Sequence, residues 1–227
     1  MKILSRSATD AQTVVYRDSN VSAGHKVLRN TYMLLSMTLL FSAMAAAATI
    51  AFNIPGPGFL LTLVGYFGLL FATTKLQNSG WGIASVFALT GFMGYTLGPM
   101  LTRYLGMPGG TGIVMTAMAM TSLIFMGLSA YVLVSKRDFS FMAGFLMVGM
   151  LVAFVASLGA FFFQIPALSL TISAVMVLLM SGMILFETSN IIHGGETNYI
   201  MATVSLYVTI FNLFTSLLHL LGFIEKE

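Results

Sequence analysis

Long apolar runs alternate with short polar or glycine- and proline-rich interruptions along most of the chain. A helix that spans a membrane needs about 20 predominantly apolar residues, and the runs have roughly that length. Such segments must be helical, because an open sheet edge would leave backbone polar groups unpaired in lipid. The pattern therefore predicts an all-α fold, a polytopic membrane protein with a bundle of seven transmembrane helices. The predicted spans cover residues 31–52, 59–76, 81–102, 112–134, 140–163, 167–191 and 199–223.

The interruptions are short, which favours a single apolar unit. "NIPGPG" (53–58) ends the first run, since proline and glycine break helices, and "HGGETN" (193–198) ends the sixth. We expect one transmembrane domain over residues 30–224 and a short tail at residues 225–227. Residues 1–29 are polar, and we expect them to form a cytoplasmic arm that is unfolded for much of its length.

The composition supports a membrane location and excludes a soluble globular protein. Hydrophobic residues make up 58% of the chain and charged residues only 7%, and the mean hydropathy is +0.94. Soluble domains carry about 25% charged residues. The chain has no cysteine, which excludes disulfides and cysteine-ligated metals.

The net charge of +3 comes from scattered basic residues, a distribution that does not indicate a nucleic-acid partner. The positions of Lys and Arg instead indicate how the chain is oriented across the membrane, because cytoplasmic loops of membrane proteins carry an excess of these residues. With a cytoplasmic N-terminus, eight of the ten fall on that side, namely the five in the arm with Lys75, Lys136 and Arg137. The C-terminus is then periplasmic, and the sixth span ends on the cytoplasmic side.

One carboxylate, Glu187, lies near the end of the sixth apolar run. Charged residues inside a membrane are costly and usually face the bundle interior or a partner. Glu187 could extend toward the lipid headgroups, or it could turn inward to meet a basic residue, for which Lys75 at the end of the second run is best placed. Paired in that way, the two side chains would form a latch that protonation breaks.

No catalytic, metal or cofactor site is predicted. H-E-x-x-H is absent, and no aspartate lies within a span. Ser129 and His219 do not form a recognisable nucleophile motif. His193 and Glu196 in "HGGE" could ligate a metal, but their glycine neighbours favour a helix stop. We therefore expect a protein that is not an enzyme.

Small residues on two spans predict close helix packing. Gly91, Gly94 and Gly98 follow one another along the third span. The first span offers Ser42, Ala43, Ala46 and Ala47. Small residues let helix backbones approach closely in lipid, where the hydrophobic drive between helices is absent.

Four stretches together resemble the Bax inhibitor-1 family of seven-span membrane proteins. They are "HKVLRNTYMLLSMTL" (25–39), "LTGFMGYTLGPML" (89–101), "LFETSNIIHGGETNYI" (185–200) and "SLYVTIFNLF" (205–214). In some members, as the resemblance implies, an acid of span six faces an aspartate of span seven near a base of span two, in a pH-sensitive calcium leak. Those positions fall on Glu187, Thr209 and Lys75, and Asn190, His193 and Asn212 are secondary polar candidates.

The threonine at position 209 departs from the leak pattern, because one acid alone lacks the coupling between two carboxylates. Bacterial members resemble modulators that bind and restrain FtsH, a membrane-anchored ATP-dependent protease. The resemblance therefore implies an inner-membrane FtsH modulator that could also meet the regulators associated with that protease. Its arm, with Lys2, Arg6 and Arg17, would be what the protease engages. A calcium or cation leak is the alternative.

Overall fold

The computed structural model describes the backbone of residues 3–224 and, within that range, the side chains of residues 24, 26–160 and 162–224. Seven α-helices account for most of these residues. They are α1 (Ile3–Ala51), α2 (Gly58–Leu76), α3 (Gly82–Leu105), α4 (Gly110–Ser135), α5 (Ala143–Phe163), α6 (Pro166–Ile192) and α7 (Tyr199–Ile224). A single 3₁₀ turn, η1 (Ser140–Met142), precedes α5. All seven helices contain a segment long and apolar enough to cross a membrane, which confirms the predicted fold class.

The ends of α6 follow from its sequence. Pro166 stands in the first turn, where its missing N–H would have no helical partner in any case. At the other end, Gly194 has a φ of +78°, the left-handed conformation that favours glycine after a helix. "HGGETN" is thus a helix stop, as predicted, and it returns the chain to α7.

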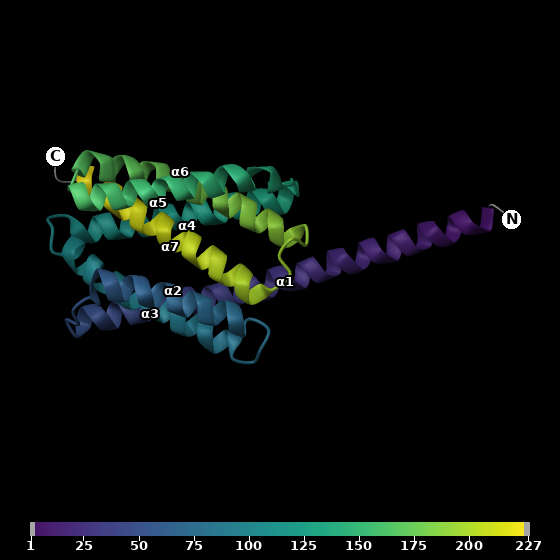
Figure 1. The fold of residues 1–227 in the computed structure, drawn as a ribbon, viewed down its shortest axis with the longest axis horizontal. Coiled ribbons are helices and arrows are strands. Elements are labelled where there is room, and N and C mark those ends of the chain that lie inside the picture. The colour runs from purple at the N-terminus through teal and green to yellow at the C-terminus, as the bar shows by residue number, and fades with distance from the viewer. Residues whose placement is uncertain (1–2, 225–227) are drawn as a thin grey trace.

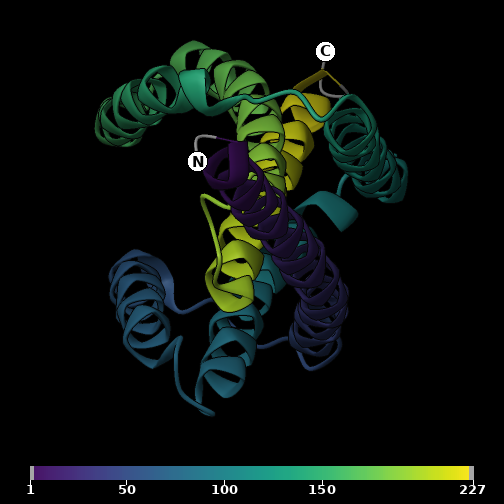
Figure 2. The same cartoon turned by 90° about the vertical axis from the view of Figure 1, so that its right-hand side faces the viewer.

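Helix α7 runs through the centre of the bundle. Figure 2 shows it between α5 and α6 on one side and α2 and α3 on the other. It packs against α1, α4 and α6, whereas α2 packs mainly on α3 and is largely exposed. Two clusters of buried apolar residues result, one around α1, α3 and the first half of α7, the other around α4, α6 and the second half of α7.

The small residues of α1 and α3 form one interface. A Cβ added at Gly94 would overlap the backbone oxygen of Ser42, and one at Gly98 would lie 2.5 Å from Thr49. Ser42 and Ala46 are buried, as the packing prediction requires. Ala43 and Ala47, which the sequence also placed on this face, are exposed.

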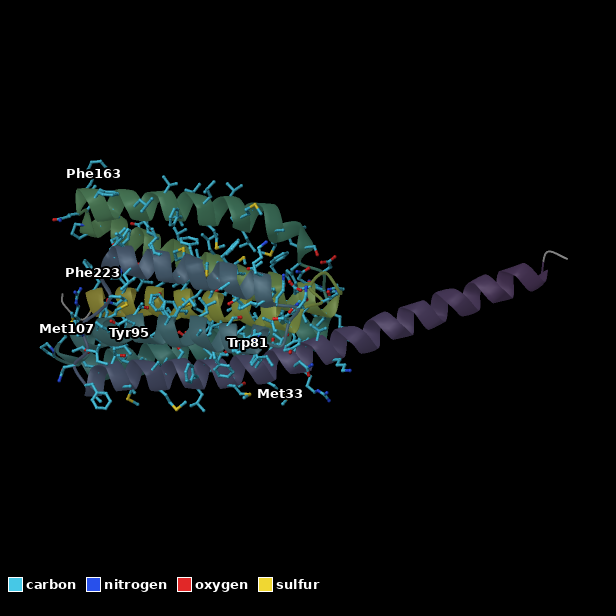
Figure 3. All side chains as sticks on the ribbon, turned by 60° about the horizontal axis from the view of Figure 1, so that its bottom comes forward. Met33, Trp81, Tyr95, Met107, Phe163 and Phe223 are labelled. Atoms are coloured by element: carbon cyan, nitrogen blue, oxygen red, sulfur yellow. The ribbon has the colours of Figure 1, made fainter. Side chains whose placement is uncertain are left out.

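Large apolar side chains cover the outside of the bundle. Met33 is 61% exposed and Phe163 is 77% exposed, and the two project from opposite edges (Figure 3). Trp81 is exposed near the end from which α1 extends, whereas Met107 and Phe223 lie at the other end. An apolar exterior of this kind suits contact with lipid acyl chains.

The polar N-terminal segment differs from our expectation. It is helical from Ile3 onward and extends α1 beyond the bundle as a straight rod (Figure 1). Extending an existing helix adds one hydrogen bond per residue without a new nucleation step, so the spanning part of α1 can propagate outward. Lys2 and the side chains of Arg6 and Arg17 lie outside the described part of the chain, as does the predicted tail at 225–227.

Candidate functional site

Glu187 faces the interior of the bundle. It lies on α6 with only 8% of its surface exposed, and its helix neighbours Ile184, Thr188 and Ile191 are also buried. Of the two sequence-based readings, extension toward the headgroups is therefore not what the structure shows. The Glu187 side chain is instead turned inward, which was the other alternative.

Thr209 on α7 is the hydrogen-bond partner of Glu187. Its hydroxyl lies 3.0 Å from Oε1 and 3.1 Å from Oε2, so it donates to a carboxylate whose two oxygens it can reach equally. Thr209 is itself buried, with 3% of its surface exposed. The resemblance placed this residue opposite Glu187, and the structure brings the two side chains together.

Lys75 does not meet Glu187, and the predicted ion pair is wrong in this structure. Lys75 is exposed in the last turn of α2, with Nζ 5.5 Å from the centre of the Phe71 ring. Its flexible stem lets the ammonium stay near water while the chain covers an aromatic face. Burying it beside Glu187 would cost the hydration of a second charge. Lys136 and Arg137, the basic residues that follow α4, are also exposed.

A cavity of ≈ 620 Å³ lies beside Glu187, between α2, α5, α6 and α7. Thr209 and Asn212 line it with Glu187, and Tyr66 of α2 and Phe154 of α5 contribute aromatic walls. We call this space the Glu187 groove. Two smaller hollows of ≈ 260 Å³ and ≈ 390 Å³ adjoin it, and Asn212 lines all three spaces.

A polar stripe on α7 follows these spaces. Ser205, Thr209, Asn212 and Ser216 are spaced by four, three and four residues, which places them on one helix face. The first three line the Glu187 groove, and Ser216 lines the hollow nearer the end of α7. Thr209 and Asn212 were predicted from the sequence, whereas Ser205 and Ser216 were not, although the heptad-like spacing of the four polar residues within an apolar helix is visible in the sequence.

The secondary polar candidates separate into two places. Asn212 lies in the groove and donates from Nδ2 to the Val208 carbonyl at 2.8 Å. Asn190 and His193 lie instead at the end of α6. The Asn190 carbonyl accepts the N–H groups of Gly195 and Glu196, and His193 Nδ1 is 2.8 Å from the Ser189 carbonyl. These two residues close the helix end and do not reach the groove.

The loop between α4 and α5 is tied to α6 close to Glu187. Ser189 Oγ accepts the Phe139 N–H at 2.9 Å and lies 3.3 Å from the Arg137 carbonyl, to which it donates. In the same loop, Asp138 accepts hydrogen bonds from the hydroxyl and N–H of Ser140. Those bonds favour the ionised carboxylate and hold the pKa of Asp138 below its usual range.

The residues considered for catalysis are not brought together. Ser129 Oγ lies 3.4 Å from Thr188 Oγ1, whereas His219 Nδ1 lies 2.8 Å from Ser173 Oγ. Glu196 accepts the Asn198 N–H within its own loop. Over the described range, no three His, Asp or Glu side chains lie close enough to hold a metal ion together.

Comparison with known proteins identifies the family. The sequence profile described as inhibitor of apoptosis-promoting Bax1 matches residues 24–226, nearly the whole chain. The chain belongs to the Bax inhibitor-1 family. The resemblance stated from the four sequence stretches is thereby confirmed.

Several bacterial proteins are similar to this chain over most of their length. The chain is 56% identical over 203 residues to a protein of Escherichia coli K12 named modulator of FtsH protease YccA, covering 89% of this chain and 92% of the relative. An Escherichia coli O6:H1 relative with the same identity and coverage is named inner membrane protein YccA. A Pseudomonas aeruginosa protein is also 56% identical, over 86% of this chain and 88% of its own. The family and relative names describe an inhibitor and a modulator, and none names an enzyme.

Proposed function

We propose that this protein acts in the bacterial inner membrane as a modulator that binds FtsH and restrains its attack on membrane proteins. The observation that carries the proposal is the 56% identity, over 89% of this chain, to the relative named modulator of FtsH protease YccA. The aligned 203 residues are most of the chain, so the proposal rests on the bundle as a whole and not on one short motif.

The distribution of charge supports a contact at one end of the bundle. Exposed basic side chains gather at the end from which α1 extends, namely Lys26, Arg29, Lys75, Lys136 and Arg137. By the positive-inside rule this end is cytoplasmic. The helical extension of α1 leaves the bundle here, and the C-terminus lies at the opposite end (Figure 1). We infer that the extension is the segment that the protease engages.

The test is reconstitution of purified protein with FtsH in liposomes. The full chain should slow the degradation of a membrane substrate and should co-purify with the protease from native membranes. A variant that lacks residues 1–20 should bind more weakly or restrain less. Unchanged degradation in the presence of the full chain would contradict the proposal, and unchanged behaviour of the shortened variant would contradict the role of the extension alone.

Glu187→Gln is the matched control for this test. Glu187 is buried inside the bundle, whereas the helical extension projects out of it, so the variant should bind the protease as the unmodified chain does. If Glu187→Gln lost binding to FtsH while its stability stayed unchanged, the contact with FtsH would lie at the groove and not at the end of the bundle.

A pH-sensitive calcium or cation leak is the second candidate. The observation that favours it is the cavity beside Glu187, which continues along the polar stripe of α7. Against it, Thr209 stands where the leak pattern has a second acid, and calcium prefers several oxygen ligands with more than one carboxylate. We expect calcium flux into liposomes equal to that of empty vesicles. Flux that disappears in Glu187→Gln would favour the leak instead.

A further inference from the structure

The Glu187 groove has the size and the shape of a small-molecule site. Its volume of ≈ 620 Å³ falls within the roughly 300–1,000 Å³ typical of ligand pockets. The adjoining hollows of ≈ 260 Å³ and ≈ 390 Å³ would let a ligand with several arms extend past Asn212 in either direction.

The groove opens sideways, toward the apolar exterior. Thr74, Phe154 and Ser205 line it and are exposed, which places the mouth between α2 and α5. Both helices are among the least buried of the candidate spans. Because Phe154 lies at the middle of α5, the mouth reaches the acyl chains of the bilayer, and a lipophilic molecule would enter there most readily.

The Glu187 carboxyl group has no basic partner among the described side chains. The Glu187 carboxylate has the Thr209 hydroxyl as its donor, and no Lys, Arg or His among the described side chains lies within ion-pair distance. An ionised carboxylate accepts about four hydrogen bonds or an equivalent counter-charge. Without a partner a buried carboxylate takes up a proton, whereas a bound cation in the place of that proton would let it stay ionised. The groove therefore favours a ligand that brings a positive charge.

The walls suit a diffuse organic cation better than a metal ion. Five methionines line the groove, Met150, Met176, Met180, Met183 and Met201. Thioether sulfur is soft and polarizable, and aromatic rings, here those of Tyr66 and Phe154, attract cations to their faces. A single carboxylate supplies too little hard oxygen coordination for a divalent ion.

We propose that the Glu187 groove binds lipophilic organic cations, amines or quaternary onium ions with aromatic or alkyl arms, that enter from the bilayer. The cationic centre lies beside the Glu187 carboxylate, and the arms lie among the methionines. This site is independent of the proposed action on FtsH, because it lies within the bundle and away from the helical extension.

Binding must weaken as the pH falls, because the proton and the cation compete for one carboxylate. The titratable groups of the helices and turn packed against α6 are Tyr131 on α4, Tyr199, Tyr207 and His219 on α7, and Lys26, Arg29 and Tyr32 in the described part of α1, with none on η1 or α5. Across the groove, α2 contributes Tyr66 and Lys75. Of all these groups, only Tyr66 lines the groove with Glu187.

The experiment measures binding of tetraphenylphosphonium to the full chain in nanodiscs of zwitterionic lipid, by equilibrium dialysis over a range of pH. Saturable binding at one site, weakening as the pH is lowered, is expected. Glu187→Gln should lower the affinity by about tenfold or more, the change that follows from loss of roughly 1.4 kcal/mol. Glu196→Gln is the matched control, because Glu196 is a carboxylate of the α6–α7 loop outside the groove, and it should bind normally.

A second variant keeps the test informative if Glu187→Gln does not fold. Ser205→Trp should fill the mouth from an exposed position of α7 and block binding while the melting temperature stays unchanged. Binding that is unaffected by both substitutions, or equal binding of the neutral triphenylphosphine oxide, would show partition into lipid or a purely apolar pocket and would overturn the proposal.

Discussion

The Thr209 hydroxyl on α7 is shared between the two oxygens of the Glu187 carboxylate on α6, at 3.0 and 3.1 Å. This hydrogen bond joins the central helix to the helix that carries the buried acid.

The first prediction follows from this contact between Thr209 and Glu187. Thr209→Val keeps the shape of the side chain but leaves the carboxylate without its donor, which should destabilise the bundle by about 1–3 kcal/mol. Thermal unfolding in detergent measures the loss. Thr209→Ser retains the hydroxyl and should recover most of it, whereas equal losses in the two variants would assign the effect to packing.

A second prediction concerns the close approach of α1 and α3. Gly94→Ala places a methyl group against the Ser42 backbone, which cannot move aside as a flexible side chain would. Overpacking of this kind costs about 1–3 kcal/mol. Gly68→Ala on α2 is the control, because nothing lies within 4 Å of the added Cβ. The melting temperature should fall for the first variant only, because alanine has the higher helix propensity and does not destabilise an uncrowded helix position. An equal fall for both variants would contradict the assignment of the loss to the contact with Ser42.

Tyr207 gives a third prediction. Its hydroxyl lies 2.5 Å from Ser42 Oγ and donates to the Thr90 carbonyl at 3.2 Å, so it links α7 to both α1 and α3. Tyr207→Phe should cost about 0.5–1.5 kcal/mol. In a double-mutant cycle with Ser42→Ala, the combined loss should be smaller than the sum, because both substitutions remove the same bond. Strict additivity would refute the coupling.

The fourth prediction is a dependence of stability on pH at the α4–α5 loop. Because the folded pKa of Asp138 is lowered by its hydrogen bonds to Ser140, the stabilisation is present above the unfolded pKa and is lost as the pH falls through the folded value. Asp138→Asn should therefore unfold at a lower temperature than the unmodified chain at neutral pH, and the difference should shrink in acid. A difference that stays constant down to acid pH would mean that this carboxylate is not the cause.

The fifth prediction tests orientation. The chain has no native cysteine, so single cysteines can be labelled without background. Gly80→Cys lies in the α2–α3 turn and Gly106→Cys in the α3–α4 turn, both at exposed positions. In intact cells whose outer membrane has been made permeable, an impermeant maleimide should label the cysteine at position 106 and not the one at position 80. The reverse pattern would place the N-terminus in the periplasm.

Hydropathy was enough to predict the seven helices, because in lipid each apolar run of sufficient length has only one way to satisfy its backbone. Hydropathy could not rank the helices by burial. In a bilayer a central helix and a peripheral one are equally apolar, so only the polar spacing of Ser205, Thr209, Asn212 and Ser216 hinted that α7 is central.

The candidate site was predicted in part for the same kind of reason. Glu187 could be placed inside because a carboxylate in an apolar run must avoid lipid. Pairing it with Lys75 failed, because proximity along the membrane normal says nothing about which way a long side chain extends. The partner that the structure does supply is a hydroxyl, and a threonine in a helix is too common to stand out from sequence alone.

The central position of α7 has a consequence for biosynthesis. This helix is synthesised after the other six, yet they assemble around it. Until α7 inserts, the Glu187 carboxylate lacks the Thr209 hydroxyl as its donor. The helices α1 to α3 and the helices α4 to α6 then also lack the central helix against which both groups pack. A nascent chain truncated before residue 199 should therefore be an unassembled membrane intermediate, recognisable to quality-control proteases by that unshielded acid.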